Sequence, residues 1–177
     1  TEGGTSMKKK IVSLALVLAL CLSLLPLTAF AEEGGTKSSI TVCSDTWTDT
    51  TYAKTNAGAV SKDGATDTDY NIYWDASTST LTLNNATIQL TSTETLTSVI
   101  SANIDVLNII LIGTNSIEVT NGQNAAFTAI FNTGTINITS GSEETGSISI
   151  KVTQTVDINN NDIIGIYTET GLTNSAN

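Results

Sequence analysis

Apolar and polar residues alternate along several short stretches of the chain from Tyr70 onward. In 70–75 and again in 80–83, apolar side chains stand at every second position. This period of two residues is typical of a β-strand with one buried face. The polar segment 75–79 lies between the two stretches and predicts a tight hairpin-like turn.

The pattern recurs farther along the chain. A small residue or valine, an isoleucine, and a ring or serine follow one another around Ile100, Ile130 and Ile166. These anchors are 30 residues apart (100 to 130) and then 36 apart (130 to 166). The most complete copy spans 129–150, where two alternating apolar pairs flank a Gly/Ser/Glu turn. A repeat of this length predicts a solenoid or array and not a single globule.

The paired alternating stretches also recur. Their copies begin at Leu81, Ile110 and Ile136, with offsets of 29 and 26 residues (81 to 110 and 110 to 136). The phase within 104–112 stays open, because a second apolar set alternates with the first: Leu107, Ile109 and Leu111. Apolar residues in both phases are expected when a strand is buried on both faces.

These features favour an all-β chain. β-Branched Thr, Ile and Val dominate after residue 39, and no apolar stripe of helical period runs far enough to predict a helix there. Successive copies of pair, polar turn and pair fit a parallel β-helix, in which each coil buries its Ile and Leu side chains against the next. An antiparallel sandwich is the competing architecture, but it does not require similar repeats.

Asparagine is frequent at the expected bends. Its side chain bonds readily to nearby backbone, and it tolerates the left-handed conformation better than most residues. Stacked asparagines can also form ladders between repeats. We expect these roles at five places: Asn84, Asn85, Asn115, Asn132 and 159–161.

The chain divides into five segments. Segment 7–31 has a Lys-rich start, an apolar run and small residues at Ala29 and Ala31, which predicts a signal peptide cleaved after Ala31. An uncleaved anchor is the alternative, although Pro26 argues against it. The plan is 1–6 as upstream non-native residues (an open frame that starts too early, or an expression scar), 7–31 as signal peptide, 32–39 as linker, 40–69 as N-terminal cap or loop, and 70–177 as β-helix repeats. Because a new repeat begins shortly before Asn177, we expect the solenoid to be truncated at the C-terminus.

Charge limits the partners of the expected mature chain. Its 146 residues (177 − 31) carry 16 acidic residues (17 − 1) and 4 lysines (7 − 3), a net charge of about −12. The chain has no Arg and no His, so a basic face for nucleic acid is lacking. Contact with a membrane is expected only through the signal peptide. We expect a monomer that is secreted, extracellular or attached to the cell surface, with Cys43 as a small buried apolar residue.

The sequence contains no recognisable catalytic centre. Without His, no Ser or Thr can be activated by an imidazole, and no Gly-x-Ser-x-Gly turn occurs. Lys151 is the only basic residue of the repeats, and it fits a solvated strand position. We therefore predict no catalytic residue in this chain.

Calcium is the one cofactor for which the sequence offers ligands. Asp67, Asp69 and Asn71 match the first oxygen ligands of a calcium loop. The match then fails, because Ile72 stands where the loop needs Gly and Thr78 where it needs Glu. The competing interpretation is a solvated acidic approach to the next strand.

Aromatic residues supply the candidate ligand contacts. Tyr73 and Trp74 lie beside Thr, Asn and Ser of the expected sheet, and sugars bind to aromatic faces and to rows of amide and hydroxyl groups. Phe131 and Tyr167 occupy equivalent repeat positions, which favours a stacked internal or corner pair over a ligand platform. Two further rings are expected to cover an exposed end of the solenoid: Trp47 and Tyr52.

Three segments carry a family resemblance: YWDASTSTLTLNNATI (73–88), AIFNTGTINITSG (129–141) and GIYTETGLT (165–173). From about Tyr70 onward, the chain resembles secreted Firmicutes surface proteins built on a right-handed parallel β-helix, including proteins with carbohydrate-binding β-helix domains. Pectin-degrading lyases and hydrolases share that fold. Because the motifs are structural, the resemblance implies the fold more closely than the ligand.

An exported scaffold that binds or displays fits these features best, with polysaccharide or a host or cell-wall glycan as its ligand. Two alternatives stay open. One is the N-terminal part of a polysaccharide lyase or hydrolase whose catalytic repeats lie beyond Asn177. The other is an adhesin stalk that projects a distal domain from the cell.

Overall fold

The computed structural model describes residues 37–92, 96–122, 126–141, 145–155 and 163–175. The expected signal peptide and the asparagine run 159–161 lie outside these ranges. All regular secondary structure within them is β-strand, which confirms the all-β class. In the same ranges, no helix has the length and apolar character that crossing a membrane requires.

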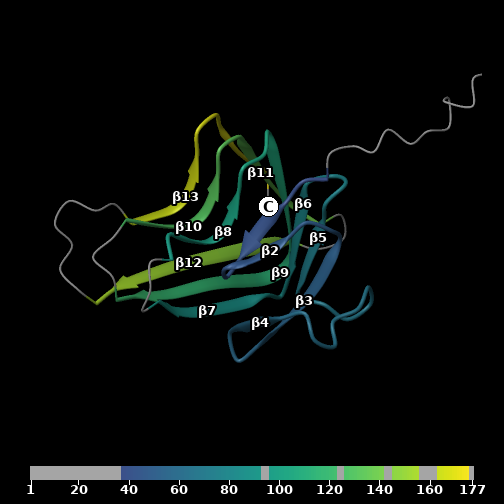
Figure 1. Cartoon of the computed structure of the whole chain (residues 1–177), viewed down its shortest axis with the longest axis horizontal. Coiled ribbons are helices and arrows are strands. Elements are labelled where there is room, and N and C mark those ends of the chain that lie inside the picture. Colours follow the sequence, from purple (N-terminus) through teal and green to yellow (C-terminus); the bar gives the residue numbers. More distant parts are fainter. Residues whose placement is uncertain (1–36, 93–95, 123–125, 142–144, 156–162, 176–177) are drawn as a thin grey trace, which may run out of the picture. The chain divides into compact units, whose positions relative to one another are not determined.

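The described strands form two mixed sheets (Figure 1). In chain order the strands are β1 (Ile40–Val42), β2 (Asp45–Trp47), β3 (Thr51–Asn56), β4 (Ala59–Ser61), β5 (Ile72–Asp75), β6 (Thr80–Asn84), β7 (Thr87–Ser92), β8 (Ser98–Ala102), β9 (Val106–Asn121), β10 (Phe127–Asn132), β11 (Thr135–Ser140), β12 (Gly146–Gln154), β13 (Ile163–Thr168) and β14 (Leu172–Asn174). The five-stranded sheet has the order β13-β10-β8-β1-β2. The nine-stranded sheet has the order β14-β11-β9-β6-β5-β3-β4, and β7 and β12 pair with β9 beside this path.

Parallel pairing joins strands from successive repeats. β8 pairs with β10 and β10 with β13, so Ile130 lies opposite Ile100 on one side and Ile166 on the other. These are the three anchors of the sequence repeat, and the structure confirms that they are equivalent. The register is well specified, because a shift by one residue would turn every buried side chain to the opposite face.

The long strand β9 takes part in two such rows. Its first part pairs in parallel with β6 and β11, and its second part with β7 and β12. Gly113 lies where the partners change, with a φ of +63°, and a Cβ atom there would lie 2.2 Å from Asn85 Oδ1. Asn85 stands at the matching bend between β6 and β7, and its φ of 49° confirms the predicted left-handed conformation. Glycine is needed at the second bend because any side chain would collide with the first.

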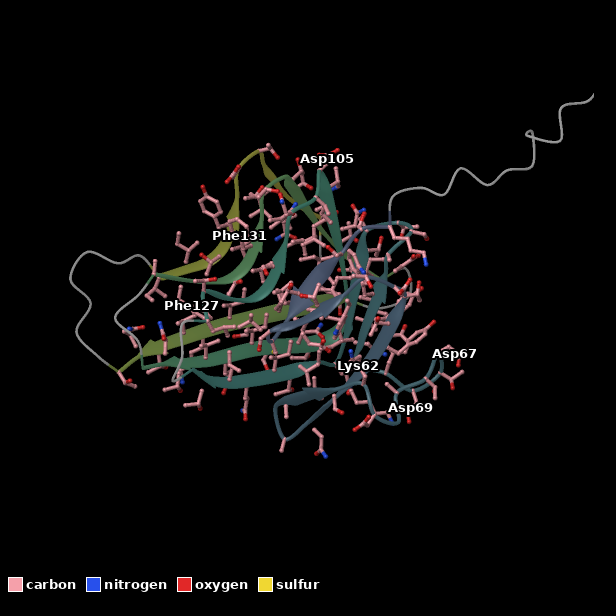
Figure 2. All side chains as sticks on the ribbon, viewed as in Figure 1. Lys62, Asp67, Asp69, Asp105, Phe127 and Phe131 are labelled. Carbon is pink, nitrogen blue, oxygen red and sulfur yellow. The ribbon has the colours of Figure 1, made fainter. Side chains whose placement is uncertain are left out.

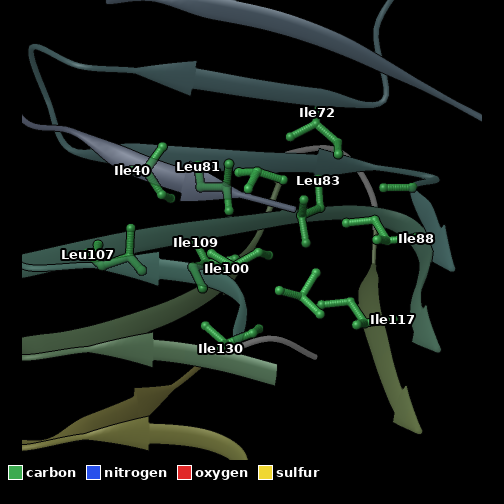
Figure 3. Packing of buried hydrophobic residues seen from close by; sticks show 14 of the residues in the cluster. Ile40, Ile72, Leu81, Leu83, Ile88, Ile100, Leu107, Ile109, Ile117 and Ile130 are labelled. Carbon is green, nitrogen blue, oxygen red and sulfur yellow. The ribbon is translucent and has the colours of Figure 1, made fainter. Parts of the chain in front are cut away.

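Apolar side chains from both sheets form one core cluster (Figure 3). Leu81 lies opposite Ile109, and Ile109 lies opposite Ile138, all three at most 5% exposed. The prediction that placed Ile110 in this buried row is wrong, since Ile110 is half-buried and lies opposite Thr82. Both phases of β9 are apolar, so the hydrophobic pattern alone could not choose between them.

Buried asparagines join neighbouring repeats at the bends. Asn115 Oδ1 accepts a hydrogen bond from the Ala86 N–H (2.8 Å). Its Nδ2 donates to the carbonyls of Ile112 and Ser147 (3.2 and 3.1 Å). Asn132 bonds to backbone in the same way at another bend. These contacts confirm the predicted bonds from asparagine side chains to backbone, which satisfy polar groups that would otherwise be buried without partners.

Strands β1 to β5 form an end of different character, which we call the antiparallel cap. β1 pairs antiparallel with β8, and β5 with β6 across the turn that follows Asp75, which confirms the predicted hairpin. Segment 40–69, predicted as cap or loop, contains four short strands. Its Thr-rich sequence has little apolar periodicity, and pairing with β8 and β5 supplies the backbone hydrogen bonds. Trp47 is 2% exposed and packs against the core cluster, as expected for a residue that covers its end.

Candidate functional site

Three tyrosine side chains gather at β3 and β5 of the nine-stranded sheet. Tyr52 and Tyr73 stack, with ring centroids 4.6 Å apart and planes 14° apart. Tyr70 lies 5.5 Å from Tyr52 and 5.7 Å from Tyr73, with its plane inclined by 54° and 55°. All three side chains are half-buried, so each keeps some surface that a ligand can contact. We call this group the tyrosine cluster.

Antiparallel pairing brings the cluster together. In the register of β3 and β5, Tyr52 lies opposite Tyr73. Ile72 and Trp74 on either side of Tyr73 are 0% exposed and face the core, so the alternation of the strand turns Tyr73 to the outer face. Tyr70 precedes β5 and adds the third ring.

An outer row of side chains continues from the cluster across the sheet. Tyr73 lies opposite Thr82, and Thr82 lies opposite Ile110. Ile110 in turn lies opposite Thr139 of β11. The row therefore places hydroxyl and aliphatic groups beside the aromatic rings.

A ladder of amide and hydroxyl groups runs beside this row. Its members follow one another in register from β6 to β14: Thr80, Asn108, Asn137 and Thr173. Asn137 Nδ2 donates to Asn108 Oδ1 (3.1 Å), and the Thr173 hydroxyl donates to Asn137 Oδ1 (2.5 Å). We call it the Asn/Thr ladder, and it offers the kind of polar groups that bind sugar hydroxyls.

Charged groups border the tyrosine cluster. Lys54 forms an ion pair with Asp69 (2.5 Å). Burial, and after it the negative charge of Asp75, raises the pKa of Tyr73, so its hydroxyl stays protonated and can donate a hydrogen bond at neutral pH. A hydrogen bond from the Ser77 hydroxyl lowers the pKa of Asp75, which therefore stays ionised.

A groove of about 490 Å³ shares a residue with the Asn/Thr ladder. It is lined by Lys37, Ser38, Ser39, Thr78, Ser79, Asn103, Ile104, Asp105, Val106 and Asn108. Asn108 is the shared residue. The hydroxyls of Ser38 and Ser79 hydrogen-bond across it (2.5 Å), and the Lys37 ammonium is paired with Asp49 (2.6 Å). The groove is therefore rich in hydroxyl, amide and backbone groups, with Asp105 as its unneutralised charge among the described contacts.

The predicted ligand residues Tyr73 and Trp74 separate in the structure. Tyr73 belongs to the tyrosine cluster. Trp74 is 0% exposed, and its indole N–H has no hydrogen-bond partner among the described residues. A side chain in that position packs in the core and cannot touch a ligand on the surface.

The predicted calcium ligands Asp67, Asp69 and Asn71 are not assembled into a site. Asp69 is engaged in the ion pair described above, and Asp67 is exposed on the same loop (Figure 2). Asn71 Oδ1 accepts a hydrogen bond from the Thr55 N–H (3.0 Å), and its Nδ2 donates to the Asn84 carbonyl (3.1 Å). Across the described ranges, no group of three or more His, Cys, Asp or Glu side chains is arranged to hold a metal ion. Asn71 thus serves to join backbone segments.

Phe131 and Tyr167 form the predicted stacked pair. They lie opposite one another on β10 and β13, with ring centroids 5.6 Å apart and planes 3° apart. Phe131 is half-buried and Tyr167 is 39% exposed, so the pair is not internal. The matched positions in two repeats explain the stack.

Cys43 and Lys151 have no neighbours that would make them reactive groups. Cys43 packs against the core, and burial raises the pKa of its thiol to about 11, so it stays protonated. Lys151 is exposed on β12, as expected for a solvated strand residue.

Comparison with protein-family models, curated proteins and solved structures finds no match to this chain. Its function therefore has to follow from the tyrosine cluster, the Asn/Thr ladder and the groove. Tyr52 and Tyr70 are the site residues that the sequence pattern did not single out as ligand contacts. The only signal for them is a high local density of tyrosine around the hairpin, since their contact depends on how β3 pairs with β5.

Proposed function

We propose that this chain is an exported binding module built as a right-handed parallel β-helix, and that it holds a polysaccharide on the outer face of the nine-stranded sheet. Parallel pairs that recur 28 residues apart (80 to 108) and up to 36 apart (130 to 166) support the β-helix. The right hand follows from the strong preference of crossovers between parallel strands. The signal-peptide pattern of segment 7–31 supports export.

The tyrosine cluster is the observation that carries the binding function. Core tyrosines are usually buried singly, whereas Tyr52, Tyr70 and Tyr73 meet on one surface and keep part of each side chain accessible. Rings of this kind give apolar contact to the C–H faces of a sugar, and their hydroxyls bond to its polar edge. The neighbouring Asn/Thr ladder extends the polar contacts across several strands.

Charge favours a neutral glycan over an acidic one. The chain has a formal net charge of −10, and Asp75 is ionised on the same face as Tyr73. A polymer of uronic acids would meet electrostatic repulsion there. A neutral, hydroxyl-rich chain would meet none.

A glycan array followed by pull-down with the mature chain tests this function. We expect retention on a neutral polysaccharide, and we expect Tyr70→Ala and Tyr73→Ala each to weaken binding by about tenfold, which corresponds to about 1.4 kcal/mol. Tyr167→Ala removes a partly exposed tyrosine from the other sheet and is the matched control. Far-UV circular dichroism of each variant shows whether the fold is retained.

Unchanged retention of folded Tyr70→Ala and Tyr73→Ala would remove the cluster from the binding site. Loss of binding in Tyr167→Ala alone would move the site to the five-stranded sheet. Running the same series with calcium and with a chelator addresses Asp67 and Asp69, and we expect equal retention because Asp69 and Asn71 already have protein partners.

A further inference from the structure

Resting on the proposed function, we infer that the groove is a second subsite for the same neutral polysaccharide, and that the module selects extended chains long enough to reach from the tyrosine cluster to the groove. The two places lie on one face. Asn108 lines the groove and also lies opposite Thr80, two residues along β6 from Thr82, which lies opposite Tyr73.

The separation follows from the sheet. Tyr73 and Asn108 are two strand spacings apart across β5, β6 and β9, and one step of two residues apart along the strand. With a spacing of about 4.8 Å and a rise of about 3.3 Å per residue, they are roughly 12 Å apart. This distance exceeds the length of a single sugar ring, so only an oligosaccharide can contact both.

The groove has the chemistry of a sugar site and not of an ion site. Hydroxyl groups of Ser38, Ser39 and Ser79 and the amide of Asn103 line it. Val106 is 40% exposed and gives an apolar surface beside them. Such a mixture bonds hydroxyl groups while it covers C–H groups.

Two linked subsites make affinity depend on chain length. A short oligosaccharide occupies one subsite, whereas a longer one occupies both, and the second contact then forms at a high effective concentration. A tenfold or larger gain in affinity is expected once the chain spans both. Beyond that length the affinity should level off.

The test measures binding of cello-oligosaccharides from dimer to hexamer by calorimetry, with the mature chain and two arginine variants. Ser39→Arg fills the groove, because Ser39 is exposed at its edge and Asp105 attracts the guanidinium group. Ser175→Arg makes the same change at an exposed position that is not part of the groove and is the matched control. Oligogalacturonates of the same lengths form the acidic comparison.

We expect the wild-type affinity to rise at least tenfold between dimer and hexamer, and Ser39→Arg to reduce the hexamer affinity to that of the dimer. Ser175→Arg should behave as wild type. Binding that is independent of length, or equal in Ser39→Arg and wild type, overturns the second subsite and leaves the tyrosine cluster as the binding site. A wild-type chain that binds neither these oligosaccharides nor any neutral glycan of the array overturns both proposals.

Discussion

Asn115 holds three successive repeats together, and its replacement by alanine should measurably destabilise the fold. The side chain is 1% exposed and bonds to the backbone of Ala86, Ile112 and Ser147. In Asn115→Ala the Ile112 carbonyl keeps its bond from the Asn85 N–H (3.0 Å). The Ala86 N–H loses its side-chain acceptor inside the core, and the Ser147 carbonyl loses its donor.

The magnitude follows from these two groups. An N–H left unsatisfied in the interior costs about 1–3 kcal/mol, and the loss of an ordinary hydrogen bond costs about 1 kcal/mol. The free energy of unfolding should therefore fall by roughly 2–4 kcal/mol. Asn103→Ala is the control, since Asn103 is exposed and accepts a hydrogen bond from the Thr133 hydroxyl (2.6 Å), and it should change stability by less than about 0.5 kcal/mol.

Equilibrium unfolding in urea, followed by tryptophan fluorescence, measures both variants. The comparison is valid if the dependence on urea has the same slope in all three chains. A loss below about 0.5 kcal/mol in Asn115→Ala would refute the reasoning, because it would mean that water or a shift of backbone satisfies the freed groups. A change in slope would instead indicate that the repeats no longer unfold together.

Two further perturbations test the packing of the repeats and the burial of the thiol. Gly134→Ala should lower stability by about 1–3 kcal/mol, since its Cβ atom would lie 2.1 Å from the Asp105 carbonyl oxygen, whereas Gly171→Ala, with nothing within 4 Å, should be nearly neutral in thermal unfolding; equal effects would contradict this packing. Above pH 9 the unfolded chain loses the Cys43 proton while the folded chain keeps it up to about pH 11, so stability should fall over this interval. Cys43→Ser should show a smaller fall in its urea midpoint, and parallel pH profiles would contradict a buried thiol.

The sequence predicts the register of the repeats well because isoleucine anchors carry it. Ile100, Ile130 and Ile166 differ from their neighbours in being apolar at matched positions, and the structure pairs them directly. Within β9 the same reasoning fails for Ile110, because both faces of that strand are apolar and hydrophobicity no longer distinguishes them.

The candidate site was predicted only in part. Tyr73 lies in the polar phase of its strand, which is why alternation places it outside and Trp74 inside. The partners of Tyr73 could not be found in this way. Tyr52 is brought to it by the antiparallel register of β3 and β5, which depends on the path of residues 57–71 and not on any local period.

The antiparallel cap also bears on the order in which the chain can fold. Its pairs close short loops, as in Val42 opposite Asp45 and Asp75 opposite Thr80. Every parallel pair instead encloses 28 residues or more, as in 80 to 108, and so carries a larger loop-closure entropy before any contact forms. The cap is thus the natural nucleus, on which each later coil is laid against a template that already exists.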